Sequence, residues 1–272
     1  MKWLLPQGIE DVPASRAELL ETARRRVLDL FISRGYDLVE PPIVEFLESL
    51  LTGAASDLRD YTLQVTDPLS GRQLGIRPDI TPQIARIDAT RGARRGDVPA
   101  RYCYAGTVLT ARSRAIDVSR TPFQVGVELF GHSGLESDVE VILLMLAMLR
   151  DLGVPVATLG LSHVGVFHGM CEQAGLTTAQ ELRLQETLER KAHPDIGTLL
   201  TQLDLPVQQQ GWFQALADLH GGHAVLQRAR DLLAGAGEVV QQALGELEDI
   251  AEKLMVRLPR LPLYFDLGEL RG

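Results

Sequence analysis

The sequence is poor in cysteine and lacks long hydrophobic runs. Its 272 residues include two cysteines, Cys103 and Cys171, so no disulfide framework is expected and a reducing cytoplasmic location is favoured. The most apolar stretch, 141–149, is too short to cross a bilayer, and the preceding 137–140 has the spacing of a capping box. It therefore predicts a buried helix. With few consecutive apolar residues before Pro6, we expect neither a secretory signal nor membrane contact.

Positive charge is scarce overall. Lys and Arg number 27 against 36 Asp and Glu, giving a net charge of −9 at pH 7. This argues against a generic nucleic-acid binder, because neutralising phosphates needs a basic surface. The exception is the stretch 86–120, which holds eight arginines against three aspartates. It predicts a possible anion site that includes Arg112, Arg114 and Arg120, and a solvated basic loop remains the alternative.

Common signatures of cofactor and metal sites are also missing. The sequence has no G-x-G-x-x-G, no P-loop and no serine-centred nucleophile elbow. His220 and His223 could pair on a metal, but no further ligand falls at a recognised spacing, so an interhelical loop is preferred. Cys103 lies between two tyrosines with nothing to make its thiol acidic, which predicts a core residue. We expect no metal and no cofactor.

Hydrophobic spacing predicts the arrangement of elements. The Ser15-x-x-Glu18 pattern opens a helix that Gly35 closes. The segment 177–255 is helical in pattern, without a strand signal. Because the strands cluster in hairpins and do not alternate with helices, an α+β fold with an antiparallel sheet is expected. The predicted strands are 63–66, 73–77, 101–110, 121–130, 156–164 and 263–267.

The strand within F-Q-V-G-V-E-L-F-G at 123–131 alternates polar and apolar residues. Successive side chains of a strand point to opposite faces, so Gln124 and Glu128 share one face. A carboxamide and a carboxylate on one sheet face suit a small zwitterion better than a hydrophobic core. An ordinary hydrated sheet face is the alternative.

A second polar signature, G-I-R-P-D-I-T-P-Q, occupies 75–83. Asp79 stands just ahead of Thr81 and Pro82, a sequence typical of an N-cap followed by the first helical position. This predicts a helix start close to the strand that carries Gln124 and Glu128.

These signatures, with four others in the same order, resemble the regulatory subunit of ATP phosphoribosyltransferase, a paralogue of histidyl-tRNA synthetase. The resemblance runs from about Gly8 to Gly272 and is weak between about Thr177 and Leu258. The matching motifs are G-I-E-D-V-P (8–13), G-Y-D-L-V-E-P-P-I-V-E (35–45), the segment 67–89, P-A-R-Y-C-Y-A-G (99–106), Q-V-G-V-E-L-F-G (124–131) and Y-F-D-L-G-E-L-R-G (264–272).

The resemblance implies a class II aminoacyl-tRNA synthetase-like antiparallel sheet flanked by helices, with a helical insertion. It implies a synthetase-like core over 1–176, the insertion over 177–258, and a returning strand of the core over 259–272.

A histidine site is also implied by the resemblance. Glu128 would hold the α-ammonium of the ligand and Gln124 would bond its polar groups, while Asp79 and Thr81 would line the same pocket. Arg271 lies where the histidine-specific loop of the family begins, although a residue so near the end can also fray.

Departures from the synthetase pattern argue against catalysis. Thr110 stands where the synthetases carry the motif 2 arginine that holds the ATP α-phosphate, and Arg112 stands at the following glutamate. A threonine cannot supply the cationic fork that offsets charge in adenylate formation. Substitution by Arg112 or Arg114 remains open. The given chain also ends at Leu-Arg-Gly, before motif 3 and before an anticodon-binding domain.

The leading hypothesis is a non-catalytic regulatory subunit that binds L-histidine and a short-form catalytic subunit. A homodimer is expected through 36–45 and the adjacent sheet, and no tRNA is expected to bind. A second hypothesis is a truncated synthetase-like paralogue that binds another amino acid or a protein. A third is an enzyme that activates an amino acid for transfer to something other than tRNA.

Overall fold

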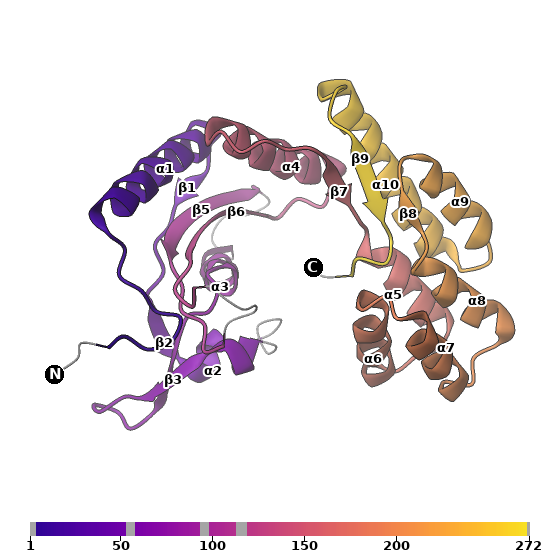
Figure 1. Cartoon of the computed structure of the whole chain (residues 1–272), viewed down its shortest axis with the longest axis horizontal. Coiled ribbons are helices and arrows are strands. Elements are labelled where there is room, and N and C mark those ends of the chain that lie inside the picture. The colour runs from indigo at the N-terminus through magenta and orange to yellow at the C-terminus, as the bar shows by residue number, and fades with distance from the viewer. Residues whose placement is uncertain (1–3, 53–57, 93–97, 113–118, 271–272) are drawn as a thin grey trace. The chain divides into compact units, whose positions relative to one another are not determined.

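The computed structural model describes residues 4–52, 58–92, 98–112 and 119–270. Contacts between Cα atoms divide the chain into two compact units, Met1–Val154 and Pro155–Gly272 (Figure 1). Helices and small, mainly antiparallel sheets build both units, which confirms the expected α+β class. The domain boundaries predicted after residues 176 and 258 stay a prediction, because a division by compactness does not test them.

The first unit contains two three-stranded sheets, with strand orders β1-β5-β6 and β2-β4-β3. Both predicted hairpins are confirmed: β3 pairs with β4, and β5 pairs with β6, each antiparallel. The elements in chain order are α1 (Ala14–Ser33), β1 (Asp37–Leu38), β2 (Val44–Phe46), α2 (Leu47–Leu50), β3 (Leu63–Thr66), β4 (Gln73–Ile76), α3 (Thr81–Gly92), β5 (Ala100–Thr107), β6 (Phe123–Phe130) and α4 (Leu135–Asp151).

The sheet β1-β5-β6 has two chemically different faces. Cys103 lies opposite Val127, and Tyr104 lies opposite Gly126 in the β5–β6 register. Residues directly opposite each other on the two strands share one face of the sheet. Successive pairs along the strands alternate between the two faces. The pair with Cys103 belongs to a core built with α1 and α4, whereas Tyr104 belongs to a core built with α3. The predicted alternation in β6 is therefore confirmed.

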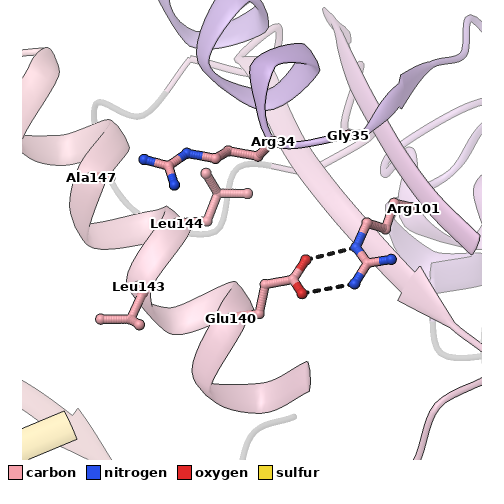
Figure 2. A pocket seen from close by; sticks show the side chains of 7 residues that line it. All are labelled: Arg34, Gly35, Arg101, Glu140, Leu143, Leu144 and Ala147. Carbon is pink, nitrogen blue, oxygen red and sulfur yellow. Dashed lines mark hydrogen bonds and ion pairs between the residues drawn. The ribbon is translucent and has the colours of Figure 1, made fainter. Parts of the chain in front are cut away.

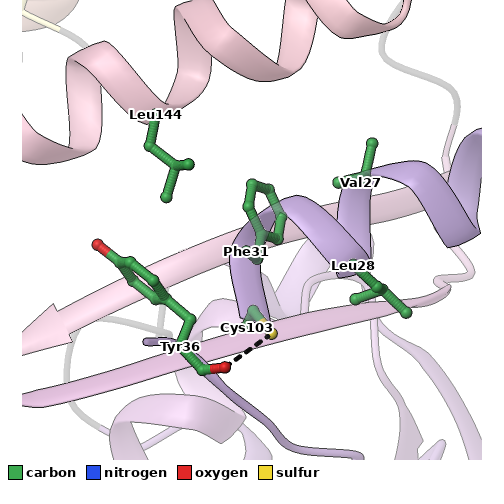
Figure 3. Close-up of a cluster of buried hydrophobic side chains, with 6 residues drawn as sticks. All are labelled: Val27, Leu28, Phe31, Tyr36, Cys103 and Leu144. Atoms are coloured by element: carbon green, nitrogen blue, oxygen red, sulfur yellow. Dashed lines mark hydrogen bonds between the residues drawn. The ribbon is translucent and has the colours of Figure 1, made fainter. Parts of the chain in front are cut away.

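The core on the first face joins α1, β5 and α4. Leu144 of α4 packs over Phe31 of α1, with Tyr36 beneath them at the end of the helix (Figure 3). Cys103 is fully buried there, as predicted, and burial raises the pKa of its thiol to about 11. The six buried residues are Val27, Leu28, Phe31, Tyr36, Cys103 and Leu144.

The sheet β2-β4-β3 depends on a close approach by α2. A Cβ atom on Gly75 would lie 2.8 Å from the Leu50 side chain and 2.9 Å from that of Thr62. Glycine in the centre of β4 therefore allows the short helix to cover one face of the sheet. The turn that joins β3 to β4 contains Pro-Leu-Ser-Gly. Its Gly71 has a φ of 72°, which residues with an L side chain rarely adopt.

The second unit is mainly helical, with a three-stranded sheet of order β7-β9-β8. Trp212 and Phe213 are buried, and the Phe213 ring meets Phe167 edge-on at 6.3 Å between centroids. Its elements are β7 (Leu159–Leu161), α5 (Val164–Gln173), α6 (Thr178–Glu189), α7 (His193–Gln202), α8 (Val207–Leu216), β8 (His220–Gly221), α9 (Ala224–Leu232), α10 (Glu238–Arg257) and β9 (Leu263–Asp266).

Two predicted helix starts are wrong. The helix α1 begins at Ala14 after Pro13, and α4 begins at Leu135 after Gly134, so both proposed capping serines lie inside their helices. Pro13 has an extended conformation, with φ −64° and ψ 157°, that directs the chain into the helix without a side-chain cap. No described helix is long and apolar enough to cross a membrane.

Two strand predictions also need correction. The strand predicted over 156–164 is shorter, and His163 instead caps α5 by accepting a hydrogen bond from the Gly165 backbone. Short apolar runs fit a strand or a buried helix equally well, which explains the error. The segment expected to lack strands contains β8, a two-residue strand stabilised by pairing with β9.

Candidate functional site

The polar face of the sheet β1-β5-β6 brings together four of the predicted site residues. Gln124 and Glu128 lie on β6, Asp79 precedes α3, and Thr81 begins it. The Gln124 amide donates to Asp79 Oδ1 at 2.9 Å, and its Oε1 accepts from the Ile80 backbone N–H at 3.0 Å. Both ends of the carboxamide are thus fixed by the loop that leads into α3.

Asp79 also organises the start of α3. Its Oδ1 accepts a hydrogen bond from the Thr81 backbone N–H at 2.9 Å. A bond to a residue two positions on is an Asx-turn, and α3 already includes Thr81, so the predicted first helical position at Pro82 is one residue late. One oxygen of Asp79 therefore serves both the helix start and Gln124.

Tyr104 is a residue of this cluster that the sequence did not indicate. Its hydroxyl lies 3.1 Å from Thr81 Oγ1 and donates to Glu128 Oε1 at 3.2 Å. The ring has room because its cross-strand partner is Gly126, where a Cβ atom would lie 2.4 Å from the Tyr104 hydroxyl. The available signal was the glycine between Gln124 and Glu128, since a glycine inside a strand often marks a close approach.

The site carries negative charge that the described residues do not neutralise. Burial is the main cause that raises the pKa of the Glu128 carboxyl, and the nearby charge of Asp79 raises it further. Hydrogen bonds from Thr81 and Tyr104 oppose these effects. Burial likewise raises the pKa of Tyr104. Within the described part of the chain, neither carboxylate forms a salt bridge, so a bound cation would gain charge-assisted hydrogen bonds here.

Arg77 fixes the loop just ahead of Asp79. It is buried, at 5% exposure, and donates from Nε to the Thr107 carbonyl at 3.1 Å and from Nη1 to the Pro41 carbonyl at 2.8 Å. Burial lowers its pKa. A Cβ atom on Gly106 would lie 2.4 Å from its Nη2, so glycine at that position makes room for the guanidinium. Arg77 thereby links β5 to the proline-containing segment before β2.

A second link ties α3 to the same proline segment. Gln83 donates from Nε2 to the Pro42 carbonyl and to Glu45 Oε1, both at 2.8 Å. Arg86 donates to the same carboxylate oxygen at 2.6 Å. The motif at 35–45 is therefore held against the helix that starts at the polar site.

Of the arginines proposed for anion binding, Arg120 has backbone partners outside this cluster. Arg120 donates from Nε to the Thr110 carbonyl at 2.8 Å and from Nη1 to the Gln7 carbonyl at 3.2 Å, so two of its donor groups serve the backbone. Arg112 is exposed, and Arg114 and Arg271 lie outside the described residues. The anion site and the role of Arg271 stay predictions.

Thr110 occupies a backbone bridge rather than an open position. It is 9% exposed, pairs with Thr62 in an isolated antiparallel bridge, and donates its N–H to the Arg120 carbonyl at 2.8 Å. The side chain expected at the position of the synthetase arginine is thus largely buried. Its uncharged hydroxyl offers no cationic fork for a phosphate.

No group of three or more His, Cys, Asp or Glu residues that could hold a metal ion occurs in the ranges that the structure describes. The two histidines near the glycine pair have other neighbours. His220 Nδ1 lies 2.8 Å from the Tyr264 hydroxyl, and the His223 ring meets Phe265 edge-on at 6.0 Å.

We expect Gly126→Ala to displace the Tyr104 ring and break its bond to Glu128. Overpacking of this kind costs about 1–3 kcal/mol, which urea unfolding measures. Gly160→Ala in β7 is the control, because a Cβ atom there meets nothing within 4 Å. Equal stabilities for the two variants would contradict the close approach at Gly126.

We expect Glu128→Gln to stabilise the chain at pH 7. Because the folded-state pKa of Glu128 is raised above 4.5, the protonated form is favoured by folding, and stability is lost as pH rises through the folded pKa. The gain from the neutral amide should therefore shrink as pH falls toward 4.5 and vanish below it. Urea unfolding between pH 4 and 8 measures this, with exposed Glu252→Gln as control. A variant less stable than the wild type at pH 7 would show that the bonds to the ionised carboxylate outweigh its burial.

Comparison with known proteins identifies the family of the chain. The histidyl-tRNA synthetase family profile matches residues 8–272. An ATP phosphoribosyltransferase regulatory subunit from Pseudomonas savastanoi is 54% identical over 271 residues, which cover 100% of this chain and 68% of that relative.

Solved structures show the same fold. A protein from Bacillus halodurans described as an ATP phosphoribosyltransferase regulatory subunit/histidyl-tRNA synthetase is 26% identical, with a TM-score of 0.84 over 98% of this chain and 68% of that one. An ATP phosphoribosyl transferase complex from Thermotoga maritima contains a chain with a TM-score of 0.61 at 15% identity, over 93% of this chain and 81% of that one. The class II synthetase-like fold is thus confirmed. The chain belongs to the family of ATP phosphoribosyltransferase regulatory subunits, which share the fold of histidyl-tRNA synthetase.

Proposed function

We propose that this chain is the non-catalytic, histidine-sensing subunit of an ATP phosphoribosyltransferase and regulates a separate catalytic subunit. The observation that carries the proposal is the pair of carboxylates, Glu128 and Asp79, set among hydrogen-bonding groups with no cation from the described chain between them. A free amino acid supplies such a cation in its α-ammonium group.

The electrostatics of the site favour an ammonium ligand specifically. Removing Glu128 from water raises the free energy of its ionised form, and a bound positive charge reverses part of that cost. Thr81 and Tyr104 hold the carboxylate in place before the ligand arrives. A site arranged in advance loses less conformational entropy on binding.

Gln124 forms part of a fixed floor for the ligand. Its Oε1 and Nε2 are already engaged by the loop before α3, so the carboxamide is held against the floor of the site. By the family resemblance the imidazole of histidine is the group to be recognised beyond this floor. The proposal is therefore that the site prefers histidine to other amino acids because it recognises this imidazole.

Absence of catalysis is supported by the surroundings of Thr110. Adenylate formation needs cationic groups on the ATP phosphates, and Thr110 is neutral and largely buried. The neighbouring Arg120 uses Nε and Nη1 on backbone carbonyls. These contacts favour a structural role for this hairpin.

The protein should give no histidine-dependent exchange between ATP and pyrophosphate. A radiolabelled pyrophosphate exchange assay measures this, with an authentic histidyl-tRNA synthetase as positive control. Exchange that requires histidine and is lost in Glu128→Ala would overturn the non-catalytic proposal.

A homodimer is proposed through residues 36–45 and the sheet β2-β4-β3. The register places Val44, Ile76 and Leu63 in one row across the three strands, and Phe46, Leu74 and Val65 in the next row on the same face. Val44, Leu63 and Val65 are 39%, 37% and 48% exposed. Contiguous apolar surface of this kind favours protein contact.

The proposed partner is the catalytic subunit, as in the Thermotoga maritima complex of related fold. Histidine can regulate that subunit only if it binds two states of the complex with different affinity. The polar site therefore has to be coupled to the contact between the subunits.

The test combines binding with assembly. We expect titration calorimetry to show saturable binding of L-histidine to the chain, abolished in Glu128→Ala and retained in Glu252→Ala. We expect co-elution with the catalytic subunit in size-exclusion chromatography for all three proteins, and histidine inhibition of the complex only where histidine binds. Separate elution at micromolar concentrations would refute the regulatory role, whereas co-elution without histidine binding would refute only the histidine site.

A further inference from the structure

A second pocket lies in the first unit, on the face of β5 opposite the polar site. Its volume is about 450 Å³, within the usual range for small-molecule sites. Figure 2 shows its wall: the end of α1 on one side, β5 on another, and one side of α4. The lining residues are Arg34, Gly35, Arg101, Glu140, Leu143, Leu144 and Ala147.

One wall of the pocket is formed by the bidentate ion pair between Arg101 and Glu140. Arg101 donates from Nε and Nη2 to the two oxygens of Glu140, each at 2.8 Å (Figure 2). Tyr36 donates its hydroxyl to Oε1 of the same carboxylate at 2.9 Å. The bonds from Arg101 are the main cause that lowers the pKa of Glu140. Because both carboxylate oxygens are engaged, this wall is a poor receptor for a ligand cation.

Arg34 is the lining residue whose charge remains unbalanced. It is exposed, and its side chain has no hydrogen-bond or ion-pair partner among the residues that the structure describes. It follows α1, where the bonds from Gly35 N–H to the Ile32 carbonyl and from Tyr36 N–H to the Phe31 carbonyl form a Schellman motif. The backbone that carries Arg34 is thereby fixed, and its guanidinium reaches toward α4 (Figure 2).

The wall formed by α4 is apolar. Leu143 and Ala147 are four residues apart and so share a helix face, with Leu144 buried beside them at 5% exposure. The side chain of Leu144 also belongs to the core under α1, so this wall is held by packing on its inner side. The pocket therefore combines one free cation with an apolar surface on a rigid support.

We propose that this pocket binds a small amphipathic monocarboxylate. The carboxylate pairs with the Arg34 guanidinium, which can donate two parallel hydrogen bonds, and the apolar body lies against Leu143 and Ala147. A single negative charge matches Arg34, the one unbalanced arginine among the described residues that line the pocket. A zwitterion is disfavoured because Glu140 is already fully engaged by Arg101 and Tyr36.

The proposed site is separate from the polar site described above. Arg101 lies opposite Leu129 in the β5–β6 register, on the face that packs against α1 and α4, while Tyr104 faces α3. The two ligands would consequently differ in chemistry: an ammonium-bearing amino acid on one face of the sheet and an apolar carboxylate on the other.

The test uses 4-methylpentanoate as the probe and its uncharged amide as the matched comparison. Saturation-transfer NMR on the full chain should detect the carboxylate at millimolar concentration and the amide at least tenfold more weakly. Arg34→Gln should lower the affinity for the carboxylate at least tenfold. Arg26→Gln, the same change at an exposed arginine within α1, should leave it unchanged, and so should Glu128→Gln at the other site.

A second variant separates the apolar wall from the charge. Ala147→Phe should fill the space beside Leu143 and abolish binding while the circular dichroism of the chain stays the same. Equal binding of the acid and the amide, no binding of the acid, or unchanged affinity in Arg34→Gln would each overturn the proposal.

Discussion

The antiparallel register of β5 and β6 is the constraint on which the rest of the first unit depends. By setting Tyr104 opposite Gly126 and Cys103 opposite Val127, it sorts the side chains of two strands onto one polar and one apolar face. A slip of one residue would exchange the two faces. The apolar face then fixes α1 and α4, and the polar face receives the start of α3 with its acidic loop.

The strands and the cluster around Glu128 could be anticipated because their signals are local. Alternation within β6 and the Asp-Ile-Thr-Pro turn are visible in a few consecutive residues. Tyr104 was missed because its role follows from a cross-strand partner, which only the register reveals. The helix starts failed for a related reason: backbone geometry at Pro13 and Gly134 took the place of the side-chain caps that the local pattern favoured.

The polar site illustrates a conflict between stability and binding. Two nearby carboxylates are unfavourable in the empty protein, since burial and the charge of Asp79 both raise the cost of ionising Glu128. Three hydroxyl or amide groups hold them in position without neutralising them. Asp79 also serves the start of α3, but the burial of the Glu128 charge is a cost to folding, and this cost is what favours a binding role.

The two sites differ in how their charges are balanced, and this difference is the basis of the two ligands proposed for them. At the polar site the uncompensated charge is negative and lies on the floor of the sheet, whereas at the second pocket it is positive and lies at the end of a helix. The Arg101–Glu140 pair shows the contrast directly, because a carboxylate on that face is already matched by a bidentate partner. Any influence of one ligand on the other would have to pass through β5, whose alternate residues face both sites. A well-packed strand with one arrangement transmits little, so coupling between the sites requires a second state of this sheet.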